Sequence, residues 1–299
     1  MAGEMTRPRA LAWAGLASVF VLMSIGNVVS ATGSGLACPD WPLCHGHVIP
    51  RFSADVLIEY SHRLVAALAS ILLVATVVVT IRQSPEPRAR RIGSVLLVLL
   101  VAQIALGGIT VRLKLPHLIS TAHLVTALLI LGGLVMLVSR DGAPVTELTR
   151  LTRVAVPALL VQLALGGYVR HAGAGLACPD FPLCSGDVLP SHWLGLVHWA
   201  HRWFGIALLG LFVHLAVAAR GTRLGRAAAV AAGLAVLQVS LGIGTVLLQL
   251  TPAIRALHAA VGYALWATVV WIAANAGGWR GTVAARQRQV RLAETRLAS

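Results

Sequence analysis

Residues 33–44 read GSGLACPDWPLC, and residues 173–184 read GAGLACPDFPLC. The two stretches match at nearly every position, cysteines included, and lie 140 residues apart in one chain. Other segments repeat with them, such as SHR at 61–63 and AHR at 200–202. The chain therefore contains one unit twice, and its fold is that of one unit doubled.

The composition places this unit in a membrane. Of the 299 residues, 58% are hydrophobic and only 11% are charged, whereas a soluble domain has about 25% charged residues. Eight apolar segments have the roughly 20 residues needed to cross a bilayer. The first of them exceeds the apolar run of about 7–15 residues in a signal peptide, so we expect a retained helix. The expected spans are 10–30, 56–80, 92–113, 118–138, 151–169, 194–219, 226–249 and 254–275.

The net charge of +14 would by itself suggest a nucleic-acid partner. Its distribution indicates membrane topology instead. Most of the 24 Lys and Arg residues fall in the two termini and in alternate loops. The other side holds only Arg51, Lys114 and Arg170 in its loops, together with Arg112 and Arg255 at the ends of spans. The positive-inside rule then predicts that both termini are cytoplasmic and that the cysteine loops lie on the outer side. Because topology explains the positive charge, we expect no nucleic-acid partner.

The expected fold class is all-α, with eight transmembrane helices in two four-helix bundles. Because each half has an even number of spans, both halves enter the membrane from the same side, and the repeats are parallel rather than inverted. We expect an N-terminal bundle at 1–139, a cytoplasmic linker at 140–153, and a C-terminal bundle with a basic cytoplasmic tail at 154–299.

Four histidines recur at matching depths in the even-numbered spans: His62, His123, His201 and His258. Ionisable groups inside a membrane are costly and point to function, although interhelical hydrogen bonding is a simpler explanation. A metal ion alone takes three or four ligands, and each half offers two. Two opposed imidazoles suit haem, which takes one axial ligand on each face.

Small residues near these histidines would let helices approach each other closely. They would equally allow close approach to a flat macrocycle, and helix packing alone explains them as well. The glycines are Gly107, Gly108, Gly166, Gly167, Gly242 and Gly244.

The two halves differ beside one histidine of each pair. EYSHR at 59–63 corresponds to HWAHR at 198–202, so Glu59 stands where the second half has His198. Each lies three residues before its histidine, on the same helix face. Glu59 is the only acidic residue within an expected span. A carboxylate is costly there unless it is paired or protonated, so Glu59 either contributes chemistry in the first half or only pairs with Arg63.

The four cysteines form two C-x₅-C patterns, with Cys38 and Cys44 in the first and Cys178 and Cys184 in the second. The haem-attachment pattern C-x-x-C-H is absent. An oxidising exterior favours disulfides. Four cysteines allow three pairings, of which the repeat favours one bridge within each loop. Structural bracing and a redox role both remain open for such small rings.

GLACPDWPLC, EYSHR, the histidine in every even-numbered span and the duplicated eight-span pattern resemble the haem A synthase family over nearly the whole chain. The resemblance implies a membrane oxidoreductase that oxidises the C8 methyl of haem O to a formyl group through successive hydroxylations. It implies that His62 and His123 hold the substrate haem O and that Glu59 is catalytic. It also implies a haem b cofactor between His201 and His258.

The resemblance carries further expectations. The protein is expected in the plasma membrane, surrounded by lipid, with haem O handed over by haem O synthase, an unidentified electron acceptor, and a homo-oligomeric state as one option. Arg63, His198 and Arg202 are candidates for supporting roles. A non-enzymatic dihaem cytochrome b that carries electrons is the main alternative, since the histidines alone fit it. A pure electron carrier does not need the lone carboxylate of Glu59, which favours the enzyme; a transporter is a weaker third interpretation.

Overall fold

The computed structural model describes residues 7–139 and 144–277. Over these ranges the chain is all-helical, and each of its eight α-helices is long and apolar enough to cross a membrane. The expected fold class, an all-α multi-pass membrane protein, is thereby confirmed. The helices are α1 (Arg7–Thr32), α2 (Ala54–Gln83), α3 (Pro87–Arg112), α4 (His117–Val138), α5 (Thr146–His171), α6 (Trp193–Ala218), α7 (Gly225–Leu247) and α8 (Pro252–Asn275), with a single 3₁₀ turn, η1 (Ala174–Leu176), before the second cysteine loop.

Most helices extend beyond the apolar segments expected from the sequence. The largest difference is at α5, which begins inside the segment expected as a linker. Its polar first turn is held against the end of α8, because Thr149 Oγ1 and the Val145 N–H both donate to the Ala276 carbonyl, at 2.6 and 3.1 Å. Similarly, α2 begins at Ala54, after the N-cap residue Ser53. Its first turn includes Asp55, which we expected in the preceding loop.

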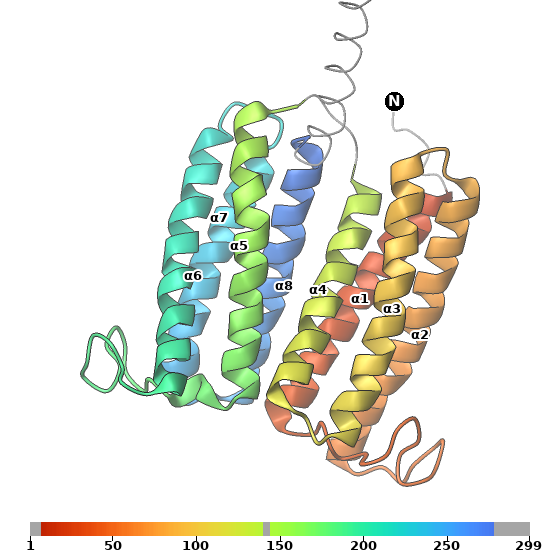
Figure 1. Cartoon of the computed structure of the whole chain (residues 1–299), viewed down its shortest axis with the longest axis vertical. Coiled ribbons are helices and arrows are strands. Elements are labelled where there is room, and N and C mark those ends of the chain that lie inside the picture. Colours follow the sequence, from red (N-terminus) through yellow and green to blue (C-terminus); the bar gives the residue numbers. More distant parts are fainter. Residues whose placement is uncertain (1–6, 140–143, 278–299) are drawn as a thin grey trace, which may run out of the picture.

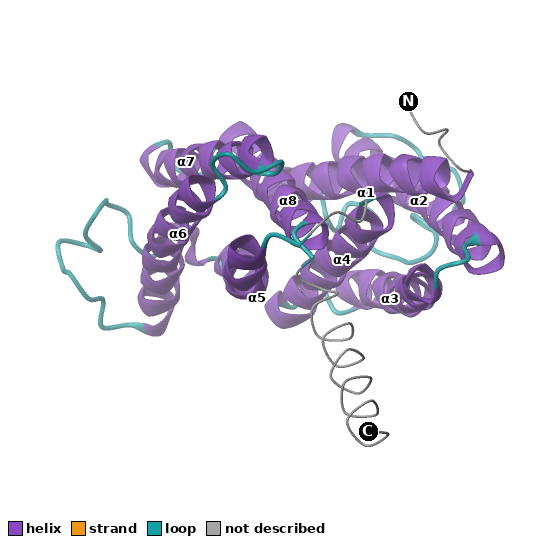
Figure 2. Ribbon diagram, turned by 90° about the horizontal axis from the view of Figure 1, so that it is seen from above, coloured by secondary structure: helices purple, strands orange, loops and turns teal. Residues whose placement is uncertain are grey.

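The helices form two groups that lie side by side (Figure 1). In the first group, α1 packs on α2 and α4, and α3 packs on the same two helices. In the second group, α5 to α8 make the corresponding set of contacts. The groups meet along α1, α4, α5 and α8 (Figure 2). One apolar core runs through both groups, and Trp266 Nε1 donates to the Leu128 carbonyl across the seam at 2.7 Å.

Both cysteine loops lie at the same end of the molecule, opposite the end where α1 begins (Figure 1). The local backbone also corresponds. His45 and Gly46 in the first loop, and Ser185 and Gly186 in the second, all have positive φ. The relation of the halves by an axis along the membrane normal stays a prediction. Part of the expected linker (140–143) and the basic tail from 278 lie outside the described residues.

Candidate functional site

Each cysteine loop is closed by its own disulfide, Cys38–Cys44 in the first and Cys178–Cys184 in the second. The pairing that the repeat favours is therefore confirmed. All four cysteine side chains are buried. Because each closed ring is bonded to the first turns of a helix, α2 in the first half and α6 in the second, the loops act as fixed caps at one end of each group.

An aspartate holds the tip of each loop in place. Asp40 accepts hydrogen bonds from the backbone N–H of Gly46 at 2.7 Å and of His45 at 2.6 Å. Asp180 accepts the corresponding bonds in the second loop. These donors, with the Gly46 or Gly186 amide contributing most, lower the pKa of each carboxyl below its ordinary value.

The first loop is expected to loosen in acid. Because the pKa of Asp40 is lowered by folding from 3.8, its contribution is complete above that value and is lost as the pH falls through the lower, folded-state pKa. Hydrogen exchange of the Gly46 amide, corrected for its intrinsic rate, should therefore lose protection between about pH 5 and pH 2. In Asp40→Asn the protection should not change over this window. Equal pH profiles for the two proteins would contradict the assignment.

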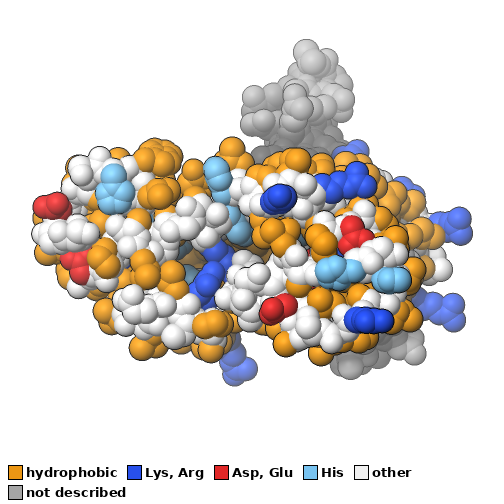
Figure 3. All heavy atoms as spheres, turned by 90° about the horizontal axis from the view of Figure 1, so that it is seen from below, with side chains coloured by type: hydrophobic (Ala, Val, Ile, Leu, Met, Phe, Trp, Pro, Cys, Tyr) orange, Lys and Arg blue, Asp and Glu red, His pale blue; other side chains and the backbone are white. Residues whose placement is uncertain are grey.

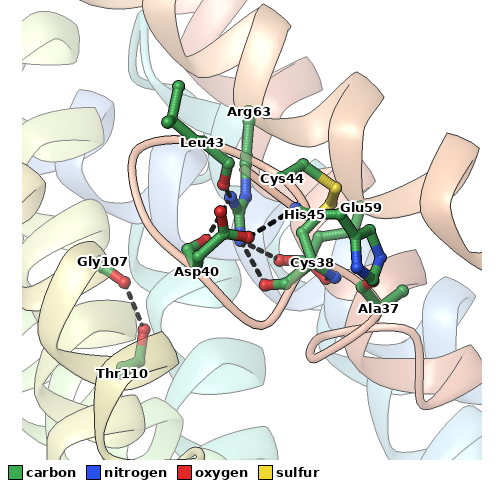
Figure 4. A network of polar contacts seen from close by, with 10 residues as sticks. All are labelled: Ala37, Cys38, Asp40, Leu43, Cys44, His45, Glu59, Arg63, Gly107 and Thr110. Carbon is green, nitrogen blue, oxygen red and sulfur yellow. Dashed lines mark hydrogen bonds and ion pairs between the residues drawn. A yellow bond between two sulfur atoms is a disulfide. The ribbon is translucent and has the colours of Figure 1, made fainter. Parts of the chain in front are cut away.

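Glu59 ties the first loop to α2 (Figure 4). Its side chain is only 3% exposed. Oε2 accepts from the Cys38 backbone N–H at 2.8 Å, and Oε1 pairs with Arg63 Nη2 at 2.5 Å. Arg63 also donates to the carbonyls of Cys38, Asp40 and Leu43, at 2.6 to 2.8 Å. The pairing with Arg63 that we considered is present, and the carboxylate has a second, structural partner in the loop backbone.

His198 occupies the corresponding place in the second half. Its Nδ1 lies 3.3 Å from the Cys178 backbone N–H, and its Nε2 lies 3.2 Å from Arg202 Nε. Arg202 also donates to the carbonyls of Cys178, Asp180 and Leu183. A neutral imidazole has one acceptor nitrogen, whereas a carboxylate accepts at both oxygens. Glu59 can thus satisfy both of its donors at once, and His198 only one of the two.

The four histidines of the spans share one local environment. Each side chain is half-buried, with a buried Nδ1 that lacks a hydrogen-bond partner. Each ring also lies against a glycine of the preceding helix, where an added Cβ would come within 2.6 to 3.2 Å of the ring carbon Cε1. The pairs are His62 with Gly26, His123 with Gly107, His201 with Gly166, and His258 with Gly242. The glycines therefore seat the imidazoles directly on helix backbones.

Three glutamines belong to the same environment, and sequence reasoning missed them. Gln103 and Gln238 place Nε2 at 3.3 and 3.4 Å from Nε2 of His123 and His258. Gln162 donates to the backbone carbonyl of His201 at 2.8 Å. Each glutamine precedes its seating glycine by four residues, so a repeated Q-x-x-x-G would have revealed them. In α1 the residue four positions before Gly26 is Leu22 instead of glutamine, so the pattern does not identify Gly26.

His201 and His258 line one cavity of about 310 Å³ in the second half. Small-molecule sites usually have about 300–1,000 Å³. The walls are mostly apolar, with leucines and Phe212 among them. His198 and Arg202 reach the same cavity from the loop side. The structure therefore places four of the candidate residues around one cavity: His198, His201 and Arg202 from α6, and His258 from α8.

The paired imidazoles fit an iron tetrapyrrole. Among the described residues, no three His, Cys, Asp or Glu side chains converge on a site for a lone metal ion. Each half offers two imidazoles, each packed on a glycine, which matches the one-ligand-per-face demand of haem iron. The residues present thus suit haem better than a protein-only metal centre.

Comparison with known proteins points the same way. A family model described as cytochrome oxidase assembly protein (COX15-CtaA) matches residues 9–57 and 51–270. A heme A synthase of Symbiobacterium thermophilum is 33% identical over 224 residues, which is 69% of this chain and 72% of the relative. A heme A synthase of Halalkalibacterium halodurans is 34% identical over 220 residues, or 65% of this chain and 70% of the relative. That of Alkalihalophilus pseudofirmus is 30% identical over 205 residues, 64% and 69% of the two chains.

Proposed function

Because the chain belongs to the COX15-CtaA family of cytochrome oxidase assembly proteins, we propose that it is a haem A synthase, which oxidises the C8 methyl of haem O to a formyl group by successive hydroxylations. The observation that carries this beyond family membership is the pair of glycine-seated histidines in each half, with a buried carboxylate beside only one of the pairs. A dihaem electron carrier would need the histidines but not Glu59.

We assign the substrate site to the first half. His62 on α2 and His123 on α4 would hold the iron of haem O from its two faces. Glu59 lies one helical turn from His62, toward the cysteine loop. A carboxylate there can accept a proton from the reacting methyl carbon or stabilise positive charge that develops on it. Arg63 fixes the cysteine loop to this end of α2 through its three carbonyl contacts.

We assign a resident haem b to the cavity of the second half, where His201 and His258 would hold its iron. Bound there, a haem supplies one-electron transfer. The other functions at this site belong to side chains and glycines of the chain itself. The seating glycines orient the imidazoles, and the apolar walls keep water from the ring. His198 and Arg202 hold the second cysteine loop in place over the cavity.

The same proposal includes the setting of the protein. We infer a plasma-membrane location with both termini cytoplasmic and both cysteine loops outside, from the positive-inside distribution. The substrate unit then comprises 1–139 and the cofactor unit 154–299. Haem O reaches the first half from the lipid or directly from haem O synthase, and a homo-oligomer would leave the second-half cavity complete because one chain supplies all of its lining residues.

Pigment analysis of two histidine variants tests these assignments. Haem extraction and mass analysis of the wild-type protein should give haem b together with haem O, haem A or the hydroxymethyl intermediate. His62→Ala is expected to keep haem b and to lose haem O, haem A and the hydroxymethyl intermediate. His201→Ala should lose chiefly haem b. Each loss should exceed about tenfold, because one of two axial ligands is removed.

His214→Ala provides the matched control, since this histidine is exposed on α6 away from the paired positions. It should leave both pigments unchanged. A wild-type protein that carries haem b alone, with no haem A formed when haem O is supplied, would support the electron carrier instead and reject the enzyme.

A further inference from the structure

Two arginines stand at the edge of the second-half cavity. Arg170 lies in the last turn of α5 and Arg255 near the start of α8, and both line the cavity that His201 and His258 share. Viewed from the end that carries the cysteine loops, basic side chains are seen in the hollow near the middle of the molecule (Figure 3). In the sequence these residues counted only as loop charges on the outer side. Their position in the fold makes them part of a binding site.

Neither guanidinium has an acidic partner. The one ion pair found among residues 7–139 and 144–277 joins Glu59 and Arg63. Arg170 donates to the side-chain and backbone oxygens of Asn27, while its Nε is buried and has no hydrogen-bond partner. Arg255 donates to the Ala31 carbonyl at 3.3 Å. A partly buried cation without a counter-charge is costly, so an anionic ligand in the cavity would be strongly favoured.

The first half lacks this pair of cations. With the repeat offsets of 140 and 135 residues, Arg170 corresponds to Ser30 and Arg255 to Ser120. Ser120 is buried, and its hydroxyl has no hydrogen-bond partner. Hydrogen bonds between charged groups are roughly twice as strong as neutral ones. Both halves therefore have paired imidazoles, but they differ in how firmly they can hold an anion.

Resting on the proposed function, we propose that Arg170 and Arg255 bind the two propionate carboxylates of the haem in the second-half cavity, and that this charge pairing makes it the resident haem. Arg170 lines the cavity with a guanidinium that has no acidic partner, and Arg255 offers the guanidinium N–H groups that do not face Ala31. In the first half, serines leave the substrate's carboxylates without a charged partner, which suits a ligand that has to leave after it is oxidised.

Haem and its dimethyl ester are the probes that test this inference. The full chain with His62→Ala, which removes the first-half site, is loaded with either compound. Dissociation is followed by transfer to apomyoglobin. The ester should dissociate at least about tenfold faster than the free acid, since it cannot pair with the arginines. In Arg255→Gln the acid should dissociate about tenfold faster and the ratio of the two rates should approach one.

Two further variants separate charge from structure. Arg170→Lys keeps a cation at the cavity, so its ratio of the two rates should fall between those of the parent and of Arg255→Gln. Asn27→Ala removes the partner of Arg170 on α1 without touching the cations, so its ratio should stay at the parent value. Equal rates for acid and ester in the parent would overturn the propionate assignment alone. A parent that binds neither compound would overturn the assignment of haem b to this half as well.

Discussion

Gly166→Ala is expected to remove the haem from the second half almost completely. A Cβ at this position would stand 2.6 Å from Cε1 of His201, closer than real side chains approach each other. The imidazole would have to move by several tenths of an ångström, whereas metal–ligand distances are held to about 0.2 Å. Haem b per chain, measured in the purified protein from its pyridine adduct, should fall at least about tenfold, in line with an overpacking cost of roughly 1–3 kcal/mol.

Gly210→Ala is the matched control on a neighbouring helix. An added Cβ at Gly210 meets nothing within 4 Å, so haem content should be unchanged. Replacing glycine by alanine in a helix adds up to about 1 kcal/mol of helix stability, which excludes a general loss of folding as the cause of an effect at Gly166. Full haem occupancy and an unchanged spectrum in Gly166→Ala would show that the glycine does not seat the axial ligand.

Glu59→Gln is expected to abolish haem A formation while haem binding persists. The amide keeps an oxygen for the Cys38 N–H but carries no charge and cannot accept a proton. General acid–base catalysis contributes about 10²–10⁴-fold, so haem A per chain, measured by mass analysis of extracted pigments, should fall by about 100-fold or more. Both pigment sites should stay filled, because neither axial ligand is altered.

Glu59→Ala separates the chemical role from the structural one. It leaves the Cys38 N–H and Arg63 without their buried partner, and breaking a buried pair costs about 3–5 kcal/mol. The alanine variant should therefore lose thermal stability in detergent as well as activity, whereas the glutamine variant should lose chiefly activity. Asp55→Asn, on the exposed first turn of α2, should leave both unchanged. Normal haem A output from Glu59→Gln would reject the catalytic assignment.

The spans and the disulfides could be predicted from the sequence because their signals are local. Apolar runs identify membrane helices, and two cysteines in one short loop have few ways to pair. The ends of α5 were harder to predict. Its polar first turn is stabilised by the hydrogen bonds that Thr149 and Val145 donate to the Ala276 carbonyl at the end of α8. A contact between residues so distant in the chain leaves no pattern in a single sequence.

The site was predictable to a similar degree. The histidines could be identified from their depth and repetition. The second partner of Glu59, however, is a backbone N–H, which every residue other than proline possesses. No side-chain pattern could indicate that Cys38 supplies it. Arg170 and Arg255 looked like surface charges, because Arg170 falls just after one expected span and Arg255 at the very start of another. In the structure both arginines line the cavity.

The contacts of Asn27 have a consequence for how the protein is made. Its side chain accepts from Arg170 on α5 and donates to the Ala256 carbonyl on α8 at 2.9 Å. Because α1 is synthesised first and α8 last of the eight helices, the side-chain amide of Asn27 gains its carbonyl acceptor only at the end of synthesis. An unsatisfied amide next to lipid is costly. The seam between the halves is therefore complete only once α8 is in place.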